Sequence, residues 1–194
     1  MNKEFIIGAI LVTILAAAIF ETPAAQMHND LAITSRVCVG VIRLDGTEER
    51  QMCGPADHNT VQNAGLQWVR DKIAFTNTSG VATTIVLGNY TNAEDGALTT
   101  LPGQQNSSSC CGLSPTTGTV VGVGTGNYSV TNLWTVAGCT GGNVLINTTA
   151  LYNQTANGCT GACLMFAGKN FSTSVTLQNG DQLNVTWYVW AASG

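Results

Sequence analysis

Charged side chains are scarce in this sequence of 194 residues. Asp, Glu, Lys and Arg make up 9% of the chain, against about 25% in a typical soluble domain. After Lys72 the only charged residues are Glu94, Asp95, Lys169 and Asp181. With a formal net charge of −4 and no cluster of basic residues, the chain lacks the electrostatic surface that DNA or RNA binding requires. We therefore expect no nucleic-acid partner, and a surface hydrated by Thr, Ser and Asn.

Residues suited to catalysis are equally few. General acid–base and nucleophilic chemistry needs positioned acids, bases or nucleophiles, yet the two histidines, His28 and His58, both lie in polar segments near the N-terminus. Gly122, Gly124 and Gly126 alternate in a Val-Gly-Val-Gly-Thr-Gly run, whose spacing matches neither a dinucleotide-binding fingerprint nor a phosphate-binding loop. We expect no enzyme, no catalytic residue and no cofactor.

One acidic cluster differs from this background. Asn92, Glu94, Asp95 and Gly96 offer the carboxylate and carbonyl oxygens that a calcium ion prefers. The same composition is typical of a solvated turn. The turn is the interpretation we favour, so no metal site is expected.

The N-terminus differs from the rest of the chain. Lys3 precedes an uncharged, mostly apolar run from Phe5 to Phe20, and small residues around Ala24 follow. A basic residue, an apolar run shorter than the roughly 20 residues of a membrane-spanning helix and a small-residue site are typical of an export signal. We expect residues 1–25 to form a hydrophobic helix that contacts the membrane, either as a signal peptide cleaved near Ala24 or as a retained anchor.

An archaeal type IV pilin leader is a third interpretation of this segment. It is disfavoured because Lys3 is followed by Glu4, where the processing site of such pilins has a small residue. All three interpretations export the domain formed by residues 26–194. We therefore expect an extracellular or cell-surface protein in an oxidising space.

Cysteine is plentiful by comparison. In an exported chain the cysteines are expected to form disulfides instead of a metal or redox site. Cys159 and Cys163 are separated by three residues, which matches neither a redox Cys-x-x-Cys pair nor a haem motif. The total of seven is odd, so one thiol stays free or pairs between subunits. The candidates are Cys38, Cys53, Cys110, Cys111, Cys139, Cys159 and Cys163.

One disulfide can be predicted from strand register. Asp45-Gly46 is a strong hairpin signal between two β-rich stretches, since both central residues of the favoured turn need positive φ. A two-residue turn places Arg43 opposite Glu48 and, further out, Cys38 opposite Cys53. Opposed residues lie about 4.5 to 5.5 Å apart at Cα, which is within reach of a disulfide.

The remaining pattern predicts β-structure. From Leu31 onward, short β-branched or aromatic stretches are broken by Gly, Asn, Thr and Ser. This pattern is typical of a sandwich or jelly roll, so we expect residues 26–194 to form a single all-β domain, an antiparallel β-sandwich that is jelly-roll-like. The expected strands are Val37–Leu44, Thr47–Cys53, Gln67–Thr76, Ala82–Leu87, Thr117–Val123, Tyr128–Val136, Val144–Tyr152 and Leu164–Asn170, with a polar loop over Pro102–Pro115.

A second register argument concerns the C-terminal strands. Val175 and Leu177 precede Asn179-Gly180-Asp181, and Leu183 and Val185 alternate after it. A three-residue loop places Leu177 opposite Leu183 and Val175 opposite Val185, with all four on one inward face. We therefore expect a hairpin at this position.

Asn-x-Ser/Thr sequons are frequent, and N-glycans would supply polar surface where charges are few. Polar strand faces also produce this spacing naturally, since residues two apart share a face. Asn184 illustrates the fit: it and Thr186 should point away from the face that carries Val185 and Trp187, which leaves the acceptor in solvent. We expect glycosylation among Asn77, Asn89, Asn106, Asn127, Asn147, Asn153, Asn170 and Asn184.

The stretch from Phe75 to Trp190 resembles a known group of proteins. The most telling part is Val-Thr-Leu-Gln-Asn-Gly-Asp-Gln-Leu-Asn-Val-Thr-Trp over residues 175–187, and the other parts are Ile73–Thr78, Ala150–Asn153 and Leu164–Ala167. These segments resemble small β-sandwich structural proteins of archaeal surface filaments and of phage or virus particles. The resemblance implies a jelly-roll-like sandwich that assembles into fibres or particles, with no active site to carry over. The cysteines and the hydrophobic leader depart from that group, and the leader favours a filament over a virion part.

These expectations converge on a self-associating, disulfide-stabilised glycoprotein, a structural subunit of an extracellular filament, pilus or cell-surface assembly. The segment Leu31–Val41 could complete the sheet of a neighbouring copy by donor-strand complementation, although it equally suits the hairpin in its own domain. Two alternatives stay open, a virion or tail structural protein and a monomeric glycan-binding adhesin domain. An adhesin would stack exposed aromatic rings on sugars, and the candidates are Tyr128, Trp134, Tyr188 and Trp190.

Overall fold

The computed structural model describes most of the chain after the N-terminal segment. The signal or anchor expected over residues 1–25 lies outside the described residues. In the part that is described, no helix has the length and apolar character needed to cross a membrane. Residues Ala32–Ala192 form one compact unit. The described ranges are 31–53, 60–73, 82–105, 111–124, 126–139, 141–153 and 164–193.

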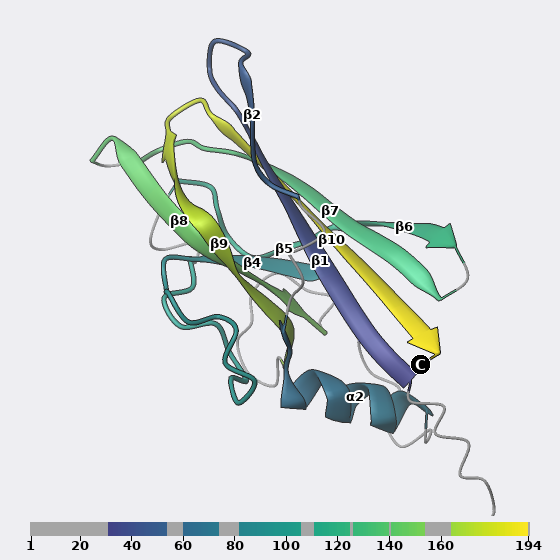
Figure 1. Ribbon diagram of the computed structural model, residues 1–194. Coiled ribbons are helices and arrows are strands. Elements are labelled where there is room, and N and C mark those ends of the chain that lie inside the picture. The colour runs from purple at the N-terminus through teal and green to yellow at the C-terminus, as the bar shows by residue number, and fades with distance from the viewer. Residues whose placement is uncertain are drawn as a thin grey trace, which may run out of the picture. The chain divides into compact units, whose positions relative to one another are not determined.

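The strands form two five-stranded sheets (Figure 1). Sheet A has the order β2-β1-β10-β7-β6, with β1 at Leu31–Ile42, β2 at Glu48–Met52, β6 at Thr119–Gly124, β7 at Asn127–Thr135 and β10 at Gln182–Ser193. Sheet B has the order β3-β9-β8-β4-β5, with β3 at Thr60–Val61, β4 at Thr84–Gly88, β5 at Thr116–Thr117, β8 at Asn143–Tyr152 and β9 at Met165–Gln178. Neighbouring strands run antiparallel. The chain is therefore all-β with the two-sheet arrangement of a sandwich, as the sequence predicts.

The main core lies between the sheets and follows the alternation of β10. Leu183, Val185 and Trp187 are 0% exposed and belong to one hydrophobic cluster with residues of both sheets. On the opposite face of β10, Asn184 is exposed and Tyr188 is half-buried. Successive side chains of a strand point to opposite faces, and full burial of one Val or Leu side chain contributes about 1.5–3 kcal/mol. Alternation thus separates an inner from an outer face of sheet A.

The turn between β1 and β2 is one residue longer than the sequence predicts. Arg43 N donates to Thr47 O at 2.8 Å, and Gly46 N donates to Arg43 O at 2.8 Å. The last loop residue, Gly46, has φ 83°, a conformation that glycine adopts without steric cost. Because of the longer loop, Ile42 faces Glu48, so the predicted pairing of Arg43 with Glu48 is wrong.

A β-bulge restores the register that the disulfide needs. Strand β2 carries one extra residue, Gln51, where the register shifts between Val39 and Gly40. The shift brings Cys38 level with Cys53, and the two form a disulfide. The predicted disulfide is confirmed, although the turn length used to predict it is wrong. The extra residue in the turn and the extra residue in β2 therefore cancel in the register between Cys38 and Cys53.

At the expected C-terminal hairpin the chain changes sheets instead. Strand β9 pairs with β8 and β3 in sheet B, whereas β10 lies between β1 and β7 in sheet A. The turn itself is present, since Asp181 N donates to Gln178 O at 3.0 Å. The residues assigned to the hairpin therefore meet across the core, not as hydrogen-bonded neighbours. All four are buried in the main core: Val175, Leu177, Leu183 and Val185.

Helix α2, Asn63–Ile73, occupies most of the segment expected to be the strand Gln67–Thr76. The strand prediction is therefore wrong over residues 67–73. In the sequence, Leu66, Val69 and Ile73 have the i, i+3, i+7 spacing that is typical of a helix, but β-favouring residues around Val69 favour a strand. In the structure Val69 packs against the main core, whereas Leu66 is 48% exposed.

The beginning of α2 lies tightly against β9. Gln62 N donates to Phe166 O at 2.9 Å, and a Cβ atom on Gly65 would overlap the same carbonyl group. The side chain of Gln62 is fully buried, and its Nε2 donates to Ala93 O at 3.1 Å. Glycine at position 65 is thus what permits the close approach of the helix to the sheet.

The outer face of sheet B is covered by residues 89–105, the segment that follows β4 (Figure 1). Met165 N donates to Thr99 O at 2.9 Å, and Leu101 N donates to the Tyr152 hydroxyl. Sheet B therefore has a second, smaller core on its outer side. This outer core consists of Val86, Ala93, Leu101, Ala150, Tyr152 and Met165.

Candidate functional site

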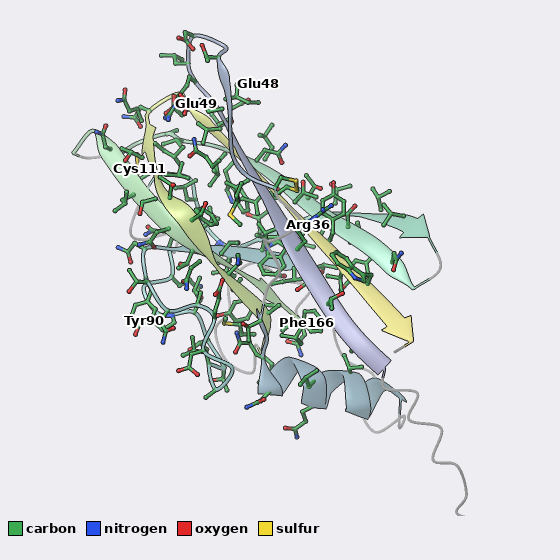
Figure 2. All side chains as sticks on the ribbon, viewed as in Figure 1. Arg36, Glu48, Glu49, Tyr90, Cys111 and Phe166 are labelled. Carbon is green, nitrogen blue, oxygen red and sulfur yellow. A yellow bond between two sulfur atoms is a disulfide. The ribbon has the colours of Figure 1, made fainter. Side chains whose placement is uncertain are left out.

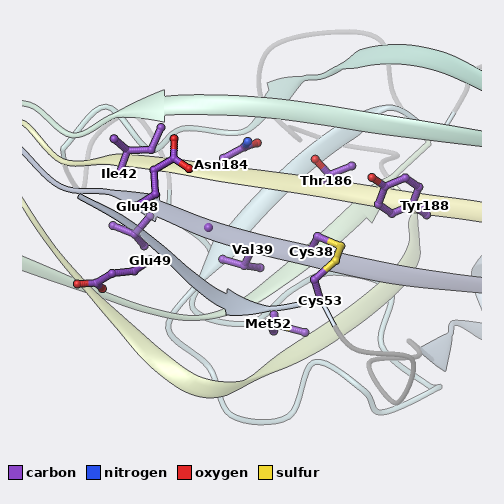
Figure 3. Close-up of a pocket in the computed structure, with 12 residues that line it drawn as sticks. Cys38, Val39, Ile42, Glu48, Glu49, Met52, Cys53, Asn184, Thr186 and Tyr188 are labelled. Carbon is purple, nitrogen blue, oxygen red and sulfur yellow. A yellow bond between two sulfur atoms is a disulfide. The ribbon is translucent and has the colours of Figure 1, made fainter. Parts of the chain in front are cut away.

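The outer face of sheet A carries a shallow groove along β1, with a volume of about 370 Å³ (Figure 3). One wall is formed by Asn184, Thr186 and Tyr188 of β10, and the disulfide Cys38–Cys53 lies opposite. An amide, a hydroxyl and a phenol along one wall offer hydrogen bonds and ring surface. Such a lining suits contact with carbohydrate or with another polypeptide.

Tyr188 is held on this face by Arg36, which projects from β1 (Figure 2). The guanidinium carbon lies 5.3 Å from the centroid of the Tyr188 ring. This distance corresponds to a cation–π contact, worth about 0.5–1 kcal/mol at exposed sites. The contact fixes the ring beside the groove and occupies part of the ring surface.

The four aromatic residues considered for sugar stacking fall into two groups. Trp134 is 3% exposed, and its Nε1 donates to Ser114 O at 3.0 Å. Tyr128 packs against the main core, and burial raises its pKa to about 12. Tyr128, Tyr188 and Trp190 are all partly exposed. The structure therefore buries one of the four rings, Trp134, and leaves the other three partly open to solvent.

An ion-pair network joins the β1–β2 hairpin to the turn between β9 and β10. Arg43 Nη2 bonds to Glu49 Oε2 at 2.7 Å, and its Nη1 bonds to Asp181 Oδ2 at 2.9 Å and to Thr176 O at 2.8 Å. The side chain of Asp181 is 5% exposed, whereas that of Glu49 is 42% exposed. Solvent screens the outer pair, which contributes at most about 1 kcal/mol. The inner pair connects sheet A to the end of sheet B.

Asp181 is the buried carboxylate of this network. Burial by itself raises its pKa, but hydrogen bonds from Gln178 N at 3.0 Å, from Arg43 and from Leu44 N at 3.2 Å outweigh burial, so the pKa lies below the ordinary value of 3.8. The pKa of Glu49 is lowered as well, chiefly by its hydrogen bond to Arg43. Both carboxylates are therefore charged at neutral pH and serve to hold the fold together.

Two disulfides lie in the described part of the chain. Cys38–Cys53 links β1 to the end of β2, and Cys111–Cys139 links the segment before β5 to the segment after β7. Ala137 N donates to Cys111 O at 3.1 Å, so the second disulfide is supported by a backbone contact. Three predicted disulfide cysteines lie outside the described residues: Cys110, Cys159 and Cys163.

The predicted glycosylation sites differ in exposure. Asn89 and Asn184 are exposed, and Asn153 is 8% exposed. As predicted, Asn184 points away from the core face of β10. Three other acceptors are half-buried, namely Asn127, Asn147 and Asn170. The remaining two, Asn77 and Asn106, lie outside the described residues.

Two of these asparagines hold backbone segments together. Asn153 Oδ1 accepts a hydrogen bond from Leu164 N at 3.0 Å. Asn170 Oδ1 accepts one from Ala93 N at 2.9 Å, which attaches the covering segment to β9. An acceptor amide must be reachable, so these geometries favour Asn89 and Asn184 over Asn153 as glycan sites.

The acidic cluster at residues 92–96 has partners within the fold. Glu94 Oε1 pairs with Lys169 Nζ at 2.9 Å and accepts from Asn170 N at 3.3 Å. Asp95 Oδ1 accepts from Ala97 N at 3.0 Å, a bond typical of an Asx turn. Among the described residues, no three His, Cys, Asp or Glu side chains come together as a metal site would require.

Strand β6 forms one edge of sheet A and is open to solvent. All six of its residues, Thr-Val-Val-Gly-Val-Gly, are exposed, and its neighbour in the sheet is β7. An exposed edge strand without charge is a template for pairing with another chain. The sequence predicts a strand here, but hydropathy does not show which strand ends a sheet.

Comparison with known proteins gives no relative: no family model, no curated protein and no solved structure matches this chain. Its own residues and their geometry carry the functional inference.

Proposed function

We propose that this chain is a secreted, non-enzymatic structural subunit of an extracellular filament, pilus or other cell-surface assembly. The observation that carries the proposal is the exposed side of sheet A. A disulfide crosses its hairpin, its outer face carries Asn184, Thr186 and Tyr188 beside a groove, and its last strand, β6, is uncharged and open. Open edges of this kind support association through backbone hydrogen bonds. The partner is a second copy of the chain, as in the jelly-roll-like structural proteins that the sequence resembles.

Export and glycosylation are part of the proposal. Disulfides persist in oxidising compartments, and Cys38–Cys53 and Cys111–Cys139 are compatible with that location. Glycans on Asn89 and Asn184 would enlarge the hydrated surface of a domain with few charges. On the outer face of sheet A, a glycan at Asn184 would also hinder unwanted face-to-face stacking.

We propose strand complementation as the mode of assembly. The position of each strand in the fold indicates which strand can pair with a neighbouring copy. Strand β1, which includes the candidate donor segment Leu31–Val41, lies in its own sheet between β2 and β10. Its side chains Val37 and Val39 are 0% and 1% exposed, and Cys38 is bonded to Cys53. Exchange of β1 between copies would therefore have to move the whole β1–β2 hairpin. Addition at an open edge needs no such rearrangement.

A glycan-binding adhesin is the second candidate. It is favoured by one observation, the groove lined by Asn184, Thr186 and Tyr188. A sugar bound there would stack on Tyr188 and hydrogen-bond to the amide and the hydroxyl. The third candidate function, a structural protein of a virion or tail, is supported only by the resemblance of the sequence.

Electron microscopy of material sheared from the surface of the producing cells tests the proposal. We expect ordered fibres or arrays in which mass spectrometry identifies this chain, and their loss when its gene is deleted. Recovery of the chain as free monomers that bind glycans would favour the adhesin. Recovery within virus particles, or in the cytosol, would overturn the proposal.

A further inference from the structure

Strand β6 extends beyond the part of sheet A that sheet B covers. Val120 pairs with Val130 of β7, so the two side chains lie on the same face. Val130 is 0% exposed, whereas Val120 is 49% exposed. On the opposite face Val121 is 53% exposed. The strand therefore presents apolar side chains to solvent on both of its faces.

The other edge strands of the two sheets differ from β6. The opposite edge of sheet A is β2, whose sequence Glu-Glu-Arg-Gln-Met is mostly charged. The edges of sheet B, β3 and β5, are two residues long. Charges and short length are the usual protections of an edge against pairing. Of the four edge strands described, β6 is the one that combines length with a lack of charge.

We propose that β6 pairs with β6 of a second copy of this chain, antiparallel across a two-fold axis, so that the two A sheets become one continuous sheet. The lack of charge on β6 indicates which strand can pair with it. A charged strand such as β2 would lose hydration against β6 and find no opposite charge there. A second β6 brings the same uncharged edge, and a two-fold contact requires a self-complementary surface.

The exposed valines of β6 also favour a second copy of β6 as the partner. In a two-fold pair the inner faces of both β6 strands are continuous, so Val120 of each copy approaches the valines of the other. The outer faces are continuous as well, which places the exposed Val121 side chains on one side of the joint. Apolar surface that a monomer leaves in water is thereby buried in the pair.

This inference goes beyond the proposed function, because it names the first contact and its symmetry. A two-fold contact closes on two copies, so longer growth uses a different surface. A paired domain without fibres would support the inference and count against the proposed function. Fibres in which β6 stays exposed to solvent would overturn the inference, and they would support a structural role that uses a surface other than β6.

The test compares the mass of the oxidised, exported chain with that of three variants by light scattering over a range of concentrations. The variants are Val121→Lys, Val121→Thr and, as a matched control, Leu133→Lys, which lies in β7 and is 49% exposed. Because all the substituted side chains are exposed, each variant should keep the circular dichroism spectrum of the folded parent, whereas weaker dimerisation should lower the thermal midpoint of Val121→Lys alone.

We expect the parent chain, Val121→Thr and Leu133→Lys to be dimeric. Val121→Lys should raise the dissociation constant by about tenfold or more, since tenfold corresponds to about 1.4 kcal/mol and the lysine places two like charges at the joint. Hydrogen exchange should show protected β6 amides in the dimers and open ones in Val121→Lys. A monomeric parent chain, an unaffected Val121→Lys dimer or an equal effect of Leu133→Lys would overturn the inference.

Discussion

The outer faces of the two sheets differ in how much of them is covered by other parts of the chain. On sheet B, Tyr152 and Met165 point outward and are 0% exposed because residues 89–105 cover them. On sheet A, Leu133 and Asn184 point outward and are exposed. Side chains of β10 alternate between the two faces of sheet A, whereas register shifts interrupt the alternation of β8 in sheet B. The difference lies in the connections that reach them.

Connection length decides which face is covered. The segment between β4 at Thr84–Gly88 and β5 at Thr116–Thr117 is long enough to fold back over sheet B. Strands β1 and β2, and strands β6 and β7, are joined by short turns that leave the outer face of sheet A open. The open face of sheet A is therefore the surface available for glycans and for neighbouring copies.

The largest expected effect comes from truncating one outward side chain on each sheet. Met165→Ala removes a fully buried side chain from the outer core of sheet B and should cost about 2–5 kcal/mol of unfolding free energy. Leu133→Ala on sheet A should stay within about 0.5 kcal/mol. Urea unfolding of both variants measures the difference. Equal, small effects would show that residues 89–105 do not cover sheet B in solution.

Removing the disulfide of sheet A should have a somewhat smaller effect. The double variant Cys38→Ser with Cys53→Ser should lose about 2–4 kcal/mol, since the cross-link restricts the unfolded chain. Without it, the β1–β2 hairpin should exchange its amide hydrogens faster, while the outer core of sheet B stays protected. An unchanged urea midpoint under oxidising conditions would show that the hairpin does not depend on the bond.

A matched pair of phenylalanine substitutions refines the comparison. Tyr152→Phe leaves the buried amide of Leu101 without its acceptor and should cost about 1–3 kcal/mol. Tyr188→Phe on the open face of sheet A should cost less than about 0.5 kcal/mol. Thermal unfolding gives both values. A larger loss for Tyr188→Phe would mean that the outer face of sheet A is covered after all.

The smallest expected effect concerns how stability depends on acidic pH at Asp181, in the turn that joins β9 of sheet B to β10 of sheet A. The pKa of Asp181 is lower in the folded chain than the ordinary 3.8, so the unfolded state binds more protons as the pH falls through that range. The contribution of Asp181 is complete above its unfolded pKa and is lost as the pH drops through its folded pKa. Asp181→Asn should therefore be less stable at neutral pH and show a shallower loss of stability below pH 3.8. Parallel pH profiles would contradict this role.

Local patterns predicted much of sheet A and its exposed site. Alternation in β10 correctly assigned Val185 and Trp187 to the core and Asn184 to the surface. The hairpin signal at Asp45-Gly46 located the β1–β2 turn, but Cys38 is level with Cys53 only because the bulge at Gln51 offsets the longer turn. Strand alternation and turns depend on residues that are close together in the chain, so local sequence patterns can predict them.

Long-range features were not predictable from the same patterns. Alternation cannot distinguish a partner in the same sheet from one across the core, so Val175 and Leu177 were placed in a hairpin that does not form. Strand β8 contains a register shift between Ile146 and Thr148, after which the outward face carries Tyr152. Neither the cover over sheet B nor the position of β6 at an edge has a local signal.

Peptide mapping without reduction, on the chain taken from the cells that produce it, tests the central claim most directly. If the protein is an exported structural subunit, the peptide with Cys38 is joined to the peptide with Cys53, and Asn184 carries a glycan. Free thiols at both cysteines together with an unmodified Asn184, in a cytosolic fraction, would contradict the account.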